Sequence, residues 1–417
     1  MPSCPPFHGN SVIRAAFVLA LFGWGVGFYG PPIFLYAVMA RTGWPLPLVS
    51  AAVTFHFLLG AGVVACLPRI HRRLGIPATT SAGAVLLAAG TMGWALAEAP
   101  WQLFVAAMLT GGGWVPLGAA GINAIISPWF TRNRPLALAK AYNGASVGGM
   151  LFSPLWAVSI EHMGFPAAAM VLGLAMIAVV LRIARGVLTR MPCAAESSAQ
   201  TQAGADCAPA PAPVQGSFWQ DRRFLTLAAA MSLGLFAQIG LIAQLFSLLA
   251  PSMGTQLAGG ITALATGCGM GGRLLMARLL GRYPQRRRAA AASYALQAAG
   301  TLLLLFAGAG HGALVLLGIV LFGLGIGNAT SLPPLIAQAD FAPADVPRVV
   351  ARSVALSQAL YAFAPALLAS LLLGAAHTPS LGTHTDAYFC AIFVLQALAA
   401  ACVLGGSRPT RSRRPAQ

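Results

Sequence analysis

Long apolar runs, separated by short polar turns, recur along the whole chain of 417 residues. Each run reaches or exceeds the ~18–20 residues that a helix needs to cross about 30 Å of hydrocarbon. The runs lack the alternation of apolar and polar positions that is typical of membrane barrels, so helices are expected. The pattern predicts twelve membrane-spanning helices, at residues 12–38, 48–68, 78–97, 101–126, 136–160, 165–188, 223–250, 256–280, 289–309, 312–337, 349–376 and 386–405.

Composition supports an all-α membrane protein. Hydrophobic residues make up 58% of the chain and charged residues only 8%, whereas a soluble domain carries about 25% charged residues. The first apolar run is too long for a cleaved signal peptide, so we expect it to serve as an uncleaved anchor. The lipid bilayer is the expected surrounding, and we expect the protein to be a monomer there.

A polar segment divides the predicted helices into two sets of six. It reads MPCAAESSAQTQAGADCAPAPAPVQGSFWQD and is rich in Ala, Pro, Ser and Gln, a composition that cannot bury enough apolar area to fold. The sequence therefore predicts an N-terminal six-helix bundle (1–188), a flexible cytoplasmic linker (189–222), a C-terminal six-helix bundle (223–405) and a basic cytoplasmic tail (406–417).

Basic residues indicate the orientation of the helices. The formal net charge is +17, but the charge lies in short turns rather than in a stripe beside a soluble domain, so nucleic-acid binding is not expected. Placing both termini and the linker in the cytoplasm puts nearly all loop arginines there and leaves Arg41 alone on the opposite side. The high Ala, Gly and Arg content favours a multi-pass protein of a bacterial inner (plasma) membrane. The cytoplasmic turns give a set of gating or structural candidates: Arg69, Arg72, Arg73, Arg132, Arg134 and Lys140.

The two halves resemble each other in sequence. GINAIISP at 121–128 matches GNATSLPP at 327–334, and the arginine-rich turns PRIHRRLG (68–75) and GRYPQRRR (281–288) occupy the same place in each half. Weak repetition in parallel orientation is typical of transporters built from two bundles around a central site.

A row of small residues follows the turn TRNR. Ala137, Ala141, Ala145 and Gly149 recur every fourth residue, so they share one face of the fifth predicted helix, and Lys140, Gly144 and Gly148 occupy the neighbouring stripe. Small side chains allow a second helix backbone to approach closely in a membrane. Close helix packing is the simplest interpretation of this row.

The arrangement resembles the major facilitator superfamily of transporters, with twelve helices, a six-plus-six repeat, a central linker and basic turns after helices two and eight. Within that family, WFTRNRPLALAKAYNGASVGG is similar to the signature of the monocarboxylate transporter and oxalate–formate antiporter branch. The chain departs from the branch pattern: PRIHRR has no Asp, FYGPPIF (28–34) has no lysine, and Gly269 stands at the acidic position ahead of Arg273.

Arg273 is the leading charged candidate for the site. It lies nine residues before Arg282, about 13 Å along the helix from the expected cytoplasmic end. An arginine facing a central cavity presents a planar fork to a carboxylate or oxyanion. The alternative is that it snorkels to the surface or braces the basic turn. His56, about 12 Å deep in helix two, is a candidate for proton coupling or simply a packing residue.

Several neutral polar residues are candidates for substrate contacts in a polar cavity near the middle of the membrane, with helix–helix hydrogen bonding as the alternative. Trp24, Trp114 and Phe236 are candidates for its apolar walls. The polar candidates are Tyr29, Asn123, Asn143, Gln238, Asn328, Gln358 and Tyr361.

No signature of an enzyme is present. The seven cysteines are scattered without paired spacing, so neither a disulfide framework nor a metal site is expected. There is no phosphate-binding GxxxxGK[ST] motif, and no cofactor is expected. The sequence favours a secondary transporter for a small organic anion such as a monocarboxylate, coupled to protons or to a counter-anion. Efflux of drug-like or hydrophobic compounds is the alternative, and a ligand sensor that does not transport is a third hypothesis.

Overall fold

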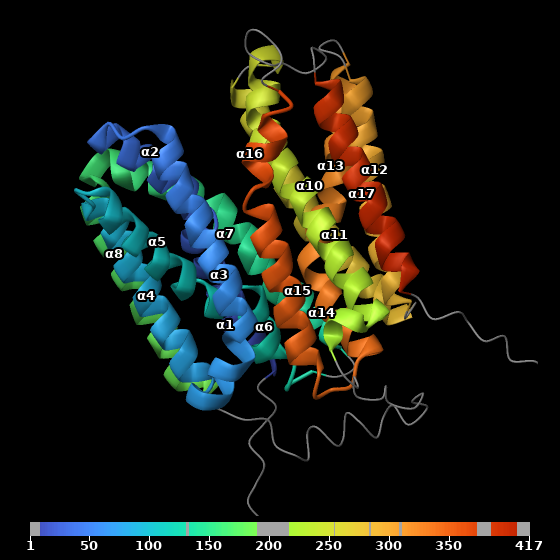
Figure 1. Ribbon diagram of the computed structural model, residues 1–417, viewed down its shortest axis with the longest axis horizontal. Coiled ribbons are helices and arrows are strands. Elements are labelled where there is room, and N and C mark those ends of the chain that lie inside the picture. The colour runs from blue at the N-terminus through green and yellow to red at the C-terminus, as the bar shows by residue number, and fades with distance from the viewer. Residues whose placement is uncertain are drawn as a thin grey trace, which may run out of the picture.

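The computed structural model describes residues 9–130, 133–189, 217–253, 255–282, 285–307, 311–372 and 385–406. The described chain is helical, and its helices form two groups that stand side by side in Figure 1. The expected linker and tail lie almost entirely outside the described residues.

The first group of helices corresponds to the first six predicted spans. The second, third, fifth and sixth spans are α3, α4, α7 and α8, of which α8 continues into a short π-helix, η2. The first span is divided into α1 and α2, and the fourth into α5, a 3-10 turn (η1) and α6. The bounds are α1 Gly9–Gly27, α2 Gly30–Thr42, α3 Leu46–Leu74, α4 Ile76–Leu96, α5 Pro100–Gly113, η1 Val115–Leu117, α6 Ala119–Ile126, α7 Arg134–Met163, α8 Phe165–Ile183 and η2 Ala184–Leu188.

The second group follows the same plan after a short 3-10 turn, η3. Its spans are α10, α11, α12, the pair α13 and α14, the pair α15 and α16, and α17. The bounds are η3 Phe218–Gln220, α10 Arg222–Met253, α11 Thr255–Arg282, α12 Arg286–Phe306, α13 Gly312–Ile326, α14 Asn328–Asp340, α15 Val346–Tyr361, α16 Ala364–Ala369 and α17 Asp386–Gly405.

Each group makes an even number of passes, so the chain enters and leaves both groups at one end, the bottom of Figure 1. We call this the terminus end, and the opposite end the far end. The two groups diverge toward the far end, which carries α2 and α16, and approach each other where α6, α14 and α15 lie. Packing between the groups is made mainly by α3 against α15 and by α7 against α11.

Eight spans in the described part of the chain are long and apolar enough to cross a membrane by a strict criterion of length and hydropathy. The remaining spans are α4, α7, α11 and the pair α15 and α16. Three of these, α7, α11 and α15, pack against the opposite group. A helix that faces protein rather than lipid tolerates polar side chains, as α7 and α11 show, although α3 also faces the opposite group and remains strongly apolar.

Close packing joins α1 and α7, the most extensive helix pair in the structure. A Cβ atom added at Gly144 would lie 2.0 Å from the Phe17 carbonyl oxygen, and one added at Gly148 would lie 2.5 Å from that of Leu21. Both distances are far inside van der Waals contact, so only glycine permits this approach. Close helix packing therefore occurs beside the row of small residues, on the stripe that contains Gly144 and Gly148.

A buried arginine ties the second group together at the terminus end. Arg287, at the start of α12, donates to Asp340 Oδ2 (2.7 Å) on α14 and to the carbonyl oxygen of Val403 (3.0 Å) on α17. It also donates to Thr226 Oγ1 (3.1 Å) and to the Arg223 carbonyl oxygen (2.9 Å) on α10. One guanidinium group thus holds four helices, and its charge is paired with a carboxylate.

We predict that Gly144→Ala lowers the thermal stability of the purified protein. The added methyl group must push α1 away from α7, and overpacking of this kind destabilises by roughly 1–3 kcal/mol. Gly62→Ala is the matched control, because Gly62 lies in α3 with open space around its Cβ position. Alanine is favoured over glycine in an open helix by about 1 kcal/mol. Equal unfolding temperatures for the two variants would contradict the close approach.

We predict that Arg287→Gln destabilises the protein more strongly. Removing one partner of a buried ion pair leaves Asp340 and three oxygen acceptors without their donor, a loss of roughly 3–5 kcal/mol. Arg288→Gln is the control, since this neighbouring side chain is exposed and bonds only Gln285 within the described residues. The measurement is the unfolding temperature in detergent, and a similar small shift for both variants would refute the role of Arg287.

Candidate functional site

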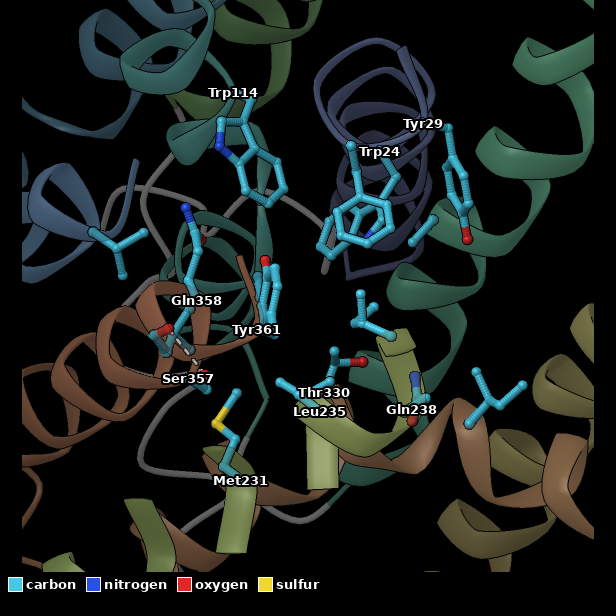
Figure 2. Close-up of a pocket in the computed structure, with 18 of the residues that line it drawn as sticks. Trp24, Tyr29, Trp114, Met231, Leu235, Gln238, Thr330, Ser357, Gln358 and Tyr361 are labelled. Carbon is cyan, nitrogen blue, oxygen red and sulfur yellow. Dashed lines mark hydrogen bonds between the residues drawn. The ribbon is translucent and has the colours of Figure 1, made fainter. Parts of the chain in front are cut away.

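A cavity of about 100 Å³ lies between the two groups of helices. Its wall from the first group comes from α1, α3, α7 and the interrupted fourth span, and its wall from the second group comes from α10, α11, α14 and α15. Figure 2 shows Trp24, Tyr29 and Trp114 facing Gln238, Gln358 and Tyr361 across this space. The cavity therefore belongs to neither group alone.

Four interrupted spans place their interruptions at the cavity wall. Phe28 and Tyr29 lie between α1 and α2, and Trp114 lies between α5 and η1. Ile326 ends α13, and Tyr361 ends α15. Irregular backbone is tolerated at membrane depth where it is buried in protein or lines a cavity, because only there can its polar groups find partners. The breaks and the cavity are therefore parts of one arrangement.

Arg273 lines the cavity from α11. Its side chain is only 5% exposed. Its Nε donates to the Gly327 carbonyl oxygen (2.9 Å), between α13 and α14, and its Nη1 donates to Asn143 Oδ1 (2.8 Å) on α7. Both acceptors are neutral, and no carboxylate lines the cavity within the described residues. An arginine keeps its positive charge in proteins, so this charge is not compensated in the described part of the structure.

Other polar groups at the cavity leave hydrogen-bonding capacity unused. The Oε1 atom of Gln238 and the Nε1 atom of Trp114 are buried and have no partner within the described residues. Gln358 Nε2 donates to the Phe57 carbonyl oxygen (2.9 Å), a second hydrogen bond between the two groups. Tyr29 and Tyr361 also lie in the wall.

Aromatic rings form the apolar part of the wall. The Tyr361 ring of the second group lies 5.9 Å from the Phe57 ring and 6.3 Å from the Phe28 ring of the first. Trp24 and Trp114 pack edge to face with a centroid separation of 6.1 Å. Offset and edge-to-face rings stabilise such contacts by about 0.5–1.5 kcal/mol beyond area burial. The Tyr361–Phe57 contact in this cluster joins α15 of the second group to α3 of the first.

His56 is fully buried next to the first interruption rather than in the cavity wall. Its Nε2 atom lies 2.9 Å from the Gly27 carbonyl oxygen, and its Nδ1 atom lies 2.8 Å from Thr110 Oγ1. A carbonyl can only accept, so Nε2 carries a hydrogen. The Thr110 hydroxyl can donate to Nδ1, or turn toward the Ala106 carbonyl oxygen (3.1 Å) and accept from Nδ1. The ring therefore has hydrogen-bond partners in both its neutral and its protonated form.

The remaining candidates from the sequence are distributed over the molecule. Asn143 reaches the site through Arg273, whereas Asn328 lines a small cavity within the second group. Asn123 and Arg134 line a separate cavity at the terminus end. Arg69, Arg72, Arg73 and Lys140 are exposed, and Arg132 lies outside the described residues.

Sequence reasoning missed part of the cavity wall. Phe28, Ser146, Met231, Thr330 and Ser357 line it and were not candidates. Phe28 and Thr330 flank helix interruptions, so the glycine and proline residues near them were an available signal. Phe236, expected as a wall residue, does not line the cavity.

No group of three His, Cys, Asp or Glu side chains within the described residues could hold a metal ion. The chemistry available at the cavity is thus that of one guanidinium group, neutral hydrogen-bonding groups and aromatic faces. Such a set is able to hydrogen-bond and orient a ligand.

Known structures share this fold. The E. coli fucose:proton symporter FucP superposes with a TM-score of 0.63 and 16% sequence identity, over 93% of this chain and 98% of the symporter. The human organic anion transporter MFSD10 (TETRAN) superposes with a TM-score of 0.65 and 15% identity, over 96% of this chain and all of that chain. No curated protein matches the chain in sequence.

The family model of the Major Facilitator Superfamily matches residues 15–367, which is most of the chain. The match, together with the shared fold, confirms the predicted fold class of two six-helix bundles. Membership of this family identifies the chain as a multi-pass membrane protein of transporter type. The chain belongs to the major facilitator superfamily.

Proposed function

We propose that the protein is a secondary transporter that moves a small organic anion, such as a monocarboxylate, by alternating access of the two bundles to a site at the central cavity. We place it in a bacterial inner membrane as a monomer, with its terminus end in the cytoplasm. Arg273 is the main counter-charge for the substrate. Tyr29, Gln238, Gln358 and Tyr361 supply further contacts.

One observation carries the proposal: the buried charge of Arg273 has only neutral partners in the described structure. Burying an unpaired charge is unfavourable, and charged groups inside membranes usually serve function. A ligand carboxylate that joins the guanidinium group supplies the missing negative charge through charge-assisted hydrogen bonds. An anion is therefore the substrate class that this site fits best.

The size of the cavity favours a small substrate. Sites for drug-sized ligands occupy about 300–1,000 Å³. The central cavity, at about 100 Å³, suits a molecule of a few non-hydrogen atoms. One structural neighbour is named as an organic anion transporter, but its likeness at 15% identity concerns the fold.

The aromatic and apolar wall favours a second candidate function, efflux of hydrophobic compounds. Trp24, Phe28, Met231 and Leu235 offer such a compound a neutral surface, and a larger opening between the bundles would be needed to admit it. The same vesicle assay separates the two functions.

Coupling to protons is a further element of the proposal, with exchange for a counter-anion as its alternative. His56 touches the break between α1 and α2 through the Gly27 carbonyl oxygen and has hydrogen-bond partners at both ring nitrogens. A proton gained or lost by its ring would change the hydrogen bonds at this break and so link the proton to movement of the first span.

We predict that Arg273→Gln lowers uptake of labelled monocarboxylates into reconstituted vesicles at least about tenfold, since hydrogen bonds to charged groups contribute roughly 1.5–3 kcal/mol. Arg273→Lys retains the charge without the planar fork and is expected to fall between the two. Arg278→Gln, on an exposed position of the same helix, is the control and should transport like the wild type.

The same assay includes labelled dicarboxylates and cationic dyes. Anion uptake that survives Arg273→Gln removes this residue from the site. Dye transport without anion transport supports efflux and contradicts the anion proposal. Unfolding temperatures of all variants show whether a loss of uptake reflects misfolding.

We predict that His56→Gln abolishes the stimulation of uptake by an imposed proton gradient while uptake without a gradient persists. Glutamine can donate to the Gly27 carbonyl oxygen but cannot bind a proton at neutral pH. His162→Gln, at an exposed position at the end of α7, should respond to the gradient as the wild type does. Gradient stimulation that persists in His56→Gln rules out this residue as the coupling group.

A further inference from the structure

A second cavity, of about 870 Å³, lies between the two bundles at the terminus end. We call it the vestibule. The first bundle contributes the end of α3, the start of α4 and the region from α6 to the start of α7; the second contributes the end of α14, the following loop and the start of α15. It is lined by different residues from the central cavity.

The vestibule carries an excess of positive charge. Arg72, Arg134 and Arg348 line it, and no Asp or Glu is among its described lining residues. Arg348 is already paired with Asp345 (3.1 Å), which stands beside the vestibule. Arg134 donates to the carbonyl oxygens of Phe130 and Ser127, so its charge is met by neutral acceptors. Arg72 is exposed and makes no hydrogen bond within the described residues.

Polar side chains in the wall have unused hydrogen-bonding capacity. The Nε2 atoms of His71 and Gln338 are buried and lack partners in the described structure. Asn123, only 4% exposed, accepts from Ser127 Oγ at 3.3 Å through its oxygen, which leaves its amide nitrogen available as a donor. Buried nitrogen atoms without partners are rare in proteins, and here they come from both bundles.

Two helices begin at the vestibule with no side-chain hydrogen bond at their N-caps. They are α4 at Ile76 and α7 at Arg134, and neither has an acidic residue in its first turn, whereas α15 has Asp345 as its N-cap residue. Helix N-termini carry partial positive charge and favour anions. Together with the arginines and the unpartnered nitrogens, they make this wall attractive to negative charge from several directions.

We propose that the vestibule is a second anion site, separate from the transport cavity, and that it binds an oxyanion of the phosphate type. Arginine forks match phosphate oxygens, and a phosphate group accepts from several donors at once. Because the ligand contacts both bundles, it binds best when they are close together at the terminus end. It therefore stabilises that arrangement, in the way any ligand stabilises the conformation it prefers.

The test is direct binding of labelled inorganic pyrophosphate to the purified full-length protein at constant ionic strength. Saturable binding is expected, with affinity reduced at least about tenfold in Arg72→Gln, the loss of one charge-assisted contact. Gln338→Leu, which removes an unpartnered nitrogen from the second bundle, should also weaken binding.

Arg69→Gln and Arg73→Gln are the matched controls. Both residues are exposed arginines in the same turns of α3 but do not line the vestibule, so each change removes the same charge at a neighbouring position. They should bind pyrophosphate as the wild type does. Equal losses in these controls, or the absence of saturable binding, overturn the proposal.

Two further arms separate this site from its alternatives. Arg273→Gln should retain pyrophosphate binding; loss in this variant would overturn a second site that is independent of the central cavity. Nanodiscs of phosphatidylcholine with and without phosphatidylglycerol identify the source of the phosphate group. Competition by the anionic lipid supports a headgroup as occupant, and unchanged pyrophosphate affinity supports a free oxyanion.

Discussion

The guanidinium group of Arg273 is held between the two bundles by neutral acceptors, one from each bundle: Gly327 in the second and Asn143 in the first. The same nitrogen atoms that make this tie are those that a ligand anion would seek. In our proposal, an arriving carboxylate competes with Asn143 for the guanidinium group and so weakens one of the contacts that joins the bundles. Binding and bundle movement would then be linked through a single side chain, which is what a transporter requires.

Interrupted helices need partners for the backbone groups that a continuous helix would satisfy internally. At three of the four interruptions, a side chain from another span forms a hydrogen bond with a backbone carbonyl oxygen. His56 meets the Gly27 carbonyl oxygen, Tyr142 donates to that of Ala119 (2.9 Å), and Arg273 donates to that of Gly327. The polar residues near the membrane centre therefore stabilise the breaks, and the breaks open the space that becomes the cavity. A polar side chain and an irregular backbone segment support each other at each of these positions.

The sequence predicted the spans well because the thickness and apolar nature of the bilayer alone set the length and hydropathy that a span needs. The predicted twelfth helix and α17 share the bounds 386–405, and the other predicted spans overlap their observed counterparts closely. The interruptions were not predicted, since apolar runs continue through them. FYGPPIF carried the clearest local signal, because Pro31 and Pro32 begin α2 after the break.

The site was harder to predict because residue type does not reveal which way a side chain faces. Arg273, Gln238 and Tyr361 line the central cavity, whereas Asn123 and Asn328 lie within the matching segments of the internal repeat, offset by one residue, and line other cavities. Arg273 lies nine residues before Arg282, the last residue of α11, and the sequence gives that position directly. Rotation about the helix axis depends instead on packing with other spans. Sequence periodicity alone does not fix that rotation in a bundle buried on several sides.

The two bundles differ in how their arginines are neutralised at the terminus end. In the second bundle, Arg287 is neutralised by Asp340 and holds four helices together. In the first, Arg134 meets only carbonyl oxygens, and Arg72 has no carboxylate partner within the described residues. A basic turn that is satisfied internally in one bundle is thus left electropositive in the other, beside the interface. A second Arg–Asp pair would have stabilised the first bundle in the same way. The lack of a carboxylate partner for Arg72 and Arg134 in the described structure is therefore better explained by reversible binding of an anion in the vestibule than by packing.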